Sequence, residues 1–197
     1  ISVRGIFRRW FPKLMLHYFN EKAGAMPRKR AIRAGDVVFG HFNRLRGFGI
    51  EDYYPQADQF ITILRDPFEM AVSDHFFRAR VSARWKSSPA LGAIEEIVSK
   101  PLNMLNHFPV SVTFDNYRSV LARFLYIGIT ERMDDSMRAI STLLKKDFIA
   151  PGTENVSERR RDTESLRAEF ERNHPLEHLV YRHAVDLFHR KQEQIVL

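Results

Sequence analysis

The chain has 197 residues, of which 31 are Lys or Arg and 24 are Asp or Glu, so its formal net charge is +7 at pH 7. A hydrophobic fraction of 44%, with 16 Phe, excludes a mostly disordered chain, and the length suits a single domain over residues 1–197. The absence of Cys excludes a disulfide scaffold, a thiol nucleophile and a Cys-ligated metal. No apolar run approaches the roughly 20 residues that span a bilayer, and the positive charge favours an anionic partner.

The pattern of apolar residues predicts strands alternating with helices along the chain. Residues 3–20 have helical spacing, although Pro12 should kink or break that helix. Residues 22–35 are polar and basic and predict a loop or a short helix. Buried strands are predicted at 37–39, 60–64 and 124–129. Further helices are predicted at 67–84, 91–98, 115–123, 133–144, 164–173 and 176–191, with a polar loop at 152–163. This order predicts an α/β fold in which helices flank a parallel sheet.

Ligands of parallel sheets bind at the carboxyl ends of the strands. The polar residues that leave these ends are His41, Arg65, Asp66, Thr130 and Glu131. An imidazole such as that of His41 can accept a proton near neutral pH, but it can equally be a histidine that is hydrogen-bonded at a strand end.

Arg65 is followed eight residues later by Ser73, about two turns into the predicted helix. The guanidinium fork of an Arg at a strand end matches a phosphate, and a nearby Ser hydroxyl adds a further hydrogen bond. The alternatives for Arg65 are an ion pair with Asp66 or a helix cap.

The segment FITILRDPFEMAVSDHFF at 60–77 resembles the 3′-phosphate-binding segment of carbohydrate sulfotransferases related to heparan sulfate 2-O-sulfotransferase and its bacterial homologues. In that family a strand leads into Arg-Asp-Pro, and a Ser eight residues after the Arg completes the site. Arg65 and Ser73 match these positions. Met70 stands where the family often has Arg, and 74–76 where Tyr is common.

Three other segments agree with the family in order and spacing. VFGHFNRL at 38–45 resembles the Gly-His segment, which implies that His41 is the general base. IGITERM at 127–133 resembles the strand followed by Thr-Glu. NVSERRRDT at 155–163 resembles the loop that closes over the nucleotide, which implies that Arg159 and Arg160 bind the donor.

The start of the chain departs from the family. The family opens with a strand and a Pro-Lys-Thr-Gly-Gly-Thr-Ser loop around the 5′-phosphosulfate, and residues 1–4 resemble only the tail of this loop. The resemblance therefore implies that Ser2 contacts the donor. It also implies a P-loop-like parallel sheet whose first strand and loop are missing upstream of Ile1, so that the domain is N-terminally incomplete.

The resemblance implies a sulfotransferase that uses 3′-phosphoadenosine 5′-phosphosulfate and a carbohydrate hydroxyl, without a metal. Two alternatives are a non-catalytic basic module that binds nucleic acid or an acidic polymer, and a degenerate sulfotransferase fold that retains Arg65 and Ser73. Because no RNA-binding signature or helix-turn-helix is present, nucleic acid is not the expected partner. The acceptor, the oligomeric state and the compartment stay open. The compartment would be the cytoplasm for a bacterial protein, or the Golgi lumen if an N-terminal anchor has been removed.

Overall fold

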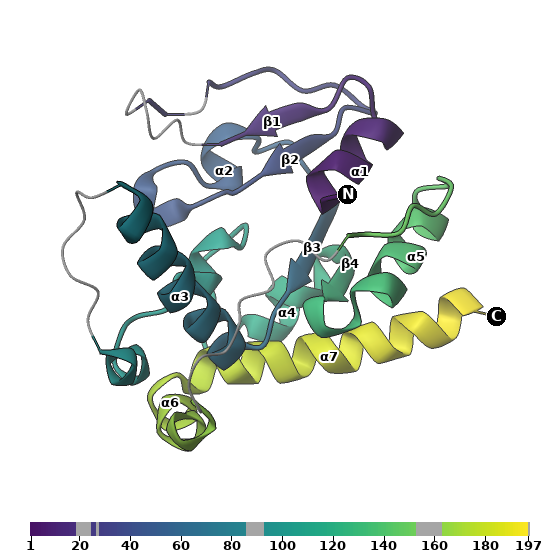
Figure 1. The fold of residues 1–197 in the computed structure, drawn as a ribbon. Helices are drawn as coiled ribbons and strands as arrows, with labels where there is room; N and C mark the ends of the chain where they lie inside the picture. Colours follow the sequence, from purple (N-terminus) through teal and green to yellow (C-terminus); the bar gives the residue numbers. More distant parts are fainter. Residues whose placement is uncertain (19–24, 27, 86–92, 153–162, 197) are drawn as a thin grey trace.

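The computed structural model describes residues 1–18, 25, 26, 28–85, 93–152 and 163–196, and it has a mixed α/β architecture (Figure 1). Two small parallel sheets are flanked by helices. The elements are α1 (Val3–Trp10), β1 (Met15–His17), β2 (Val38–Gly40), α2 (Ile50–Tyr53), β3 (Phe60–Leu64), α3 (Pro67–Trp85), α4 (Tyr117–Ala122), β4 (Phe124–Ile129), α5 (Met133–Leu143), α6 (Arg167–Asn173) and α7 (Pro175–Val196). Short 3₁₀ turns lie at Arg44–Arg46, Ile94–Val98, Met104–His107, Thr130–Arg132 and Glu164–Leu166.

The first sheet pairs β1 with β2 in parallel, in the register that places His17 opposite Gly40. A β-carbon on Gly40 would lie 1.9 Å from the carbonyl oxygen of His17, so only glycine permits this approach. The predicted helix over 3–20 is wrong beyond Trp10, because β1 occupies Met15–His17. Pro12 explains the stop: its ring fixes φ and it has no N–H for a helical hydrogen bond.

The second sheet pairs β3 with β4 in parallel, from Ile61 opposite Tyr126 to Leu64 opposite Ile129. Both strands occupy the ranges that the sequence predicts. Asp66 caps the helix that follows β3, since its carboxylate accepts a hydrogen bond from the Glu69 amide at 2.9 Å. The parallel register brings the carboxyl ends of β3 and β4 to one edge of the sheet.

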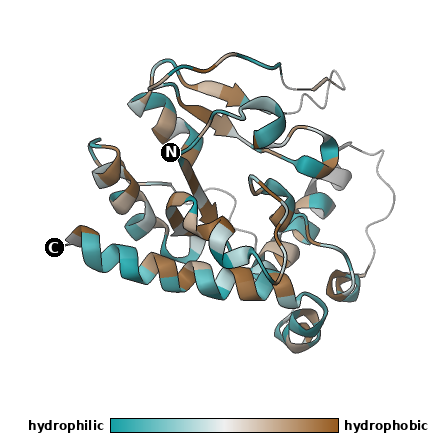
Figure 2. Ribbon diagram, turned by 180° about the vertical axis from the view of Figure 1, so that it is seen from behind, coloured by the Kyte–Doolittle hydropathy of each residue, from teal (hydrophilic) through white to brown (hydrophobic). Residues whose placement is uncertain are grey.

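One core cluster joins α1 to the β3–β4 sheet and to the helices around it. α5 and α7 both pack on β4, and the hydrophobic strands lie inside while α7 alternates hydrophobic and hydrophilic residues (Figure 2). Ile6 and Trp10 of α1 are buried in this core, and the Phe7 ring lies 5.2 Å from that of Phe39 in β2. α1 therefore contacts both sheets.

The four strands form two pairs rather than the single sheet that the sequence predicts. Among the described residues, β2 pairs only with β1, and β3 pairs only with β4. The parallel α/β prediction is confirmed at this level, whereas a continuous P-loop-like sheet is not.

Candidate active site

A pocket of about 570 Å³ lies where β3 and β4 end. It is lined by Arg65, Asp66, Glu69, Thr130, Glu131, Arg167 and Tyr181. Four of these residues are the ones that the sequence predicts at the ends of the two strands. Two guanidinium groups and three carboxylates thus share one pocket, so the way in which these charges pair decides what it can bind.

Glu131 connects three elements at the pocket. Its Oε1 accepts a hydrogen bond from the Asp66 amide at 3.1 Å, and its Oε2 accepts one from the Tyr181 hydroxyl at 2.9 Å. Burial, followed by the contact with this carboxylate, raises the pKa of Tyr181, so the hydroxyl stays protonated and donates. Glu131 therefore holds the end of β4 to the end of β3 and to α7.

Arg167, at the start of α6, makes the densest set of ion pairs in this region. Its Nη1 lies 3.1 Å from Asp66 Oδ1, and its Nη2 lies 2.9 Å from Glu69 Oε1. Its Nε lies 2.5 Å from Glu164 Oε1, and the guanidinium carbon lies 4.5 Å from the centre of the Phe68 ring. Sequence reasoning missed this residue, because Asp66 and Glu69 are 101 and 98 positions away in the chain.

Arg65 directly follows β3, whereas Glu69 lies in the first turn of α3 and Ser73 one turn further along that helix. The Arg65 side chain is 38% exposed, and its Nη2 is 4.0 Å from Glu69 Oε2. Ser73 is half-buried, four residues beyond Glu69 and hence on the same helix face. Within the described part of the chain, neither the Arg65 guanidinium nor the Ser73 hydroxyl makes a hydrogen bond. Ser73 is not part of the pocket wall.

His41 lies in a different cluster, at the carboxyl ends of β1 and β2. Its amide donates to the His17 carbonyl at 3.1 Å, and its exposed ring is 5.2 Å from that of Tyr18 and 6.2 Å from that of His107. Although the residue is exposed to solvent, the protein atoms around its ring remove part of its hydration, and this desolvation lowers the pKa of His41. The imidazole is therefore neutral at pH 7, the form that accepts a proton.

Among the described residues, the charged side chains near the two rings beside His41 include Arg4, Arg8 and Arg46. Arg4 of α1 lies 6.0 Å from the centre of the Tyr18 ring. Burial is the main cause that lowers the pKa of His107; a hydrogen bond to the Phe42 carbonyl acts in the opposite direction, and the nearby Arg46 lowers the pKa further. This setting suits a neutral base next to an anionic group.

The predicted site residues are therefore only partly brought together. We expected the strand that ends at His41 to lie next to the strand that delivers Arg65, but β2 pairs with β1 and β3 pairs with β4. Ser2 is the N-cap of α1, where its hydroxyl accepts from the Gly5 amide at 3.3 Å. Arg159 and Arg160 lie outside the described residues.

The described residues contain no group of three or more His, Cys, Asp or Glu that could hold a metal ion. Within the same ranges, none of the helices combines the length and apolar character needed to cross a membrane. Comparison of the chain with family models, curated proteins and solved structures found no match.

Proposed function

We propose that this chain is a sulfotransferase domain that uses 3′-phosphoadenosine 5′-phosphosulfate as donor and a carbohydrate hydroxyl as acceptor. The observation that carries the proposal is the pair formed by Arg65 and Ser73. Arg65 directly follows the carboxyl end of a parallel strand, its guanidinium makes no hydrogen bond to another described residue, and Ser73 lies eight residues further along the chain, on α3. A 3′-phosphate between them would accept charge-assisted hydrogen bonds.

Two clusters suit a donor with two anionic ends. The Arg65–Ser73 pair would take the 3′-phosphate, and the 5′-phosphosulfate would extend towards the cationic surroundings of His41. There the acceptor oxygen forms a bond to sulfur while the bond from sulfur to the bridging phosphate oxygen breaks. The acceptor proton moves to the His41 imidazole, and adenosine 3′,5′-bisphosphate leaves.

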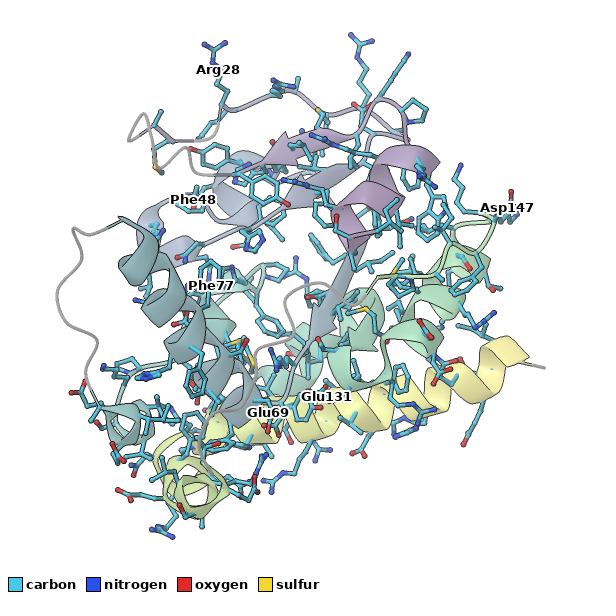
Figure 3. All side chains as sticks on the ribbon, in the orientation of Figure 1. Arg28, Phe48, Glu69, Phe77, Glu131 and Asp147 are labelled. Carbon is cyan, nitrogen blue, oxygen red and sulfur yellow. The ribbon has the colours of Figure 1, made fainter. Side chains whose placement is uncertain are left out.

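A second candidate function is a basic binding module without catalysis. The observation that favours it is the exposed cationic segment made of Arg28, Lys29, Arg30 and Arg33. Figure 3 shows Arg28 pointing away from the body of the molecule. Such a segment would suit an acidic polymer, which it would bind with strong dependence on salt.

Titration calorimetry with adenosine 3′,5′-bisphosphate and 5′-AMP tests the first function. We expect the bisphosphate to bind more tightly, and Arg65→Ala to weaken it by about 10- to 150-fold, because charge-assisted hydrogen bonds contribute roughly 1.5–3 kcal/mol each. The matched control is Arg78→Ala, an exposed arginine on α3 that pairs with Asp74.

Equal affinity for the two nucleotides in the wild-type chain would contradict the proposal. Binding to heparin, lost when the cationic segment is neutralised, together with no binding of either nucleotide, would favour the binding module.

A further inference from the structure

We propose that Arg167 is the positioning residue that allows a phosphate to bind between Arg65 and Ser73. It does so by neutralising the carboxylates of Asp66 and Glu69 beside that position. This inference rests on the proposed function, since it names the group on which the 3′-phosphate site depends.

The arrangement on α3 poses an electrostatic problem for an anion. Glu69 and Ser73 share one face of α3, and Glu69 Oε2 is 4.0 Å from the guanidinium of Arg65, which lies just before the helix. An unpaired carboxylate here would repel a phosphate and would compete for the Arg65 donors. Figure 3 shows Glu69 close to Glu131, so the negative charge on this side of the pocket is concentrated.

The contacts of Arg167 resolve this problem. Glu69 Oε1 is 2.9 Å from Arg167, more than 1 Å closer than Glu69 Oε2 is to Arg65. A second nitrogen of the same fork holds Asp66 at 3.1 Å. The carboxylate nearest to Arg65 is therefore committed to Arg167, and the Arg65 fork keeps its donors for a ligand.

The fork of Arg167 is fixed in place by its surroundings. Its plane packs against the fully buried Phe68 ring, its third nitrogen pairs with Glu164, and its side chain is only 27% exposed. Partial burial reduces screening by water, so the charge of Arg167 acts strongly on the two carboxylates. A Lys at this position would keep the charge but lose the fork that holds two carboxylates at once.

The test is a double-mutant cycle on Arg167 and Glu69, read by calorimetry with adenosine 3′,5′-bisphosphate and with inorganic phosphate. Arg167→Gln should weaken bisphosphate binding by about 10- to 100-fold, because it leaves uncompensated negative charge beside the phosphate. Glu69→Gln should bind no more weakly than wild type. The double variant should bind at least about threefold more tightly than Arg167→Gln, since the carboxylate nearest to Arg65 is gone and only that of Asp66 stays unpaired.

Rescue separates a charge-neutralising role from a merely structural one. If Arg167 only held α6 in place, Glu69→Gln would add a second lost contact and affinity would fall further. Arg167→Lys serves if Arg167→Gln does not fold: because Lys loses the fork that holds two carboxylates, this variant should bind more weakly than wild type and should regain affinity when Glu69→Gln is added. The matched control is Arg132→Gln, an exposed arginine that pairs with Asp135 on α5.

The two ligands distinguish failure of this inference from failure of the proposed function. Tight bisphosphate binding by wild type and by Arg167→Gln alike, or no rescue in the double variant, overturns the role of Arg167 and leaves the function standing. If the affinities of the variants for inorganic phosphate change in the expected order, but wild type binds the bisphosphate no more tightly than 5′-AMP, the role of Arg167 is supported and the proposed function is overturned. No binding of either ligand to wild type overturns both.

Discussion

At the scale of single residues, the chemistry of His41 follows from where β2 ends. The backbone of His41 continues the ladder through its hydrogen bond to the His17 carbonyl, and its side chain then leaves the sheet edge and remains exposed. Desolvation by the protein atoms around the ring lowers its pKa, which favours the neutral imidazole. A base that is both neutral and accessible can take a proton from an acceptor hydroxyl.

His41→Ala should therefore lower turnover in a protein with sulfuryl-transfer activity by about 10²- to 10⁴-fold, the usual contribution of a general base. Affinity for adenosine 3′,5′-bisphosphate should stay nearly unchanged, because the imidazole lies in a different cluster from Arg65. The measurements are initial rates at saturating donor and calorimetry with the bisphosphate. His189→Ala, at an exposed position on α7, is the control. Normal turnover with lost nucleotide binding would make His41 a donor-site residue instead.

The residues of the pocket divide into those that sequence can predict and those that it cannot. Arg65, Asp66 and Glu131 could be placed at one edge, because parallel strands end on the same side and each residue directly follows a strand. Arg167 and Tyr181 could not be predicted, because they reach this edge only through the packing of α6 and α7. Local patterns contain no information about partners about 100 residues away.

At the scale of elements, Ser136 connects β4 to α5. Its hydroxyl accepts from the Ile129 amide at 2.8 Å and donates to the Ile129 carbonyl at 3.0 Å, and the side chain is fully buried. Gly128 makes room for this contact, since a β-carbon there would lie 2.9 Å from the Ser136 β-carbon. The end of the strand is thus hydrogen-bonded to the first turn of the helix that follows it.

Ser136→Ala should destabilise the fold by about 1–3 kcal/mol, because it leaves a buried amide and a buried carbonyl without this partner. Urea denaturation followed by circular dichroism measures the loss. Ser119→Ala is the matched control, since Ser119 donates to a backbone carbonyl on an exposed helix face and should cost far less. Equal urea midpoints for the two variants would contradict the stabilising role of the hydrogen bonds between Ser136 and Ile129.

The same scale shows where pattern reading succeeded. β3 and β4 were predicted with their observed bounds, because each is a continuous run of apolar residues with clear stops on both sides. The helix predicted over 3–20 was wrong beyond Trp10, because the apolar spacing continues past Pro12 while the backbone cannot. β1 was missed for this reason, and with it the neighbours of His41.

At the scale of the whole molecule, strand order was the feature that sequence could not supply. The alternation of strands and helices predicts parallel pairing, which both sheets show. Which strands pair depends on contacts between distant segments, such as that of Phe7 on α1 with Phe39 in β2. The division into two sheets is consequently visible only in three dimensions.

Histidine burial is a second property of the whole molecule. The pKa values of His17, His41, His107 and His178 are all lowered, and in each case burial is the first cause. The most enclosed of these rings is that of His17, with 0% exposure, stacked on Phe42 at 4.6 Å and edge-on to Tyr53 at 4.7 Å. Its Nε2 donates to the Phe48 carbonyl at 3.2 Å, which holds the neutral ring in place.

These shifts predict that stability falls as the pH drops below about 6.5, the ordinary pKa of histidine. The unfolded chain then binds protons that the folded chain still excludes, so the free energy of unfolding decreases until the pH reaches the lower native pKa values. Each such histidine contributes at most about 1.4 kcal/mol per pH unit inside its window.

Urea denaturation between pH 7.5 and about pH 5 measures the free energy of unfolding as a function of pH. The slope of this free energy against pH should be shallower in His17→Gln than in wild type, even though the variant is less stable at pH 7.5. His189→Gln, with its exposed ring, should keep the wild-type slope. Stability that is flat or rises on acidification in this range, or a His17→Gln profile parallel to wild type, would show that buried neutral histidines do not control the acid response of this fold.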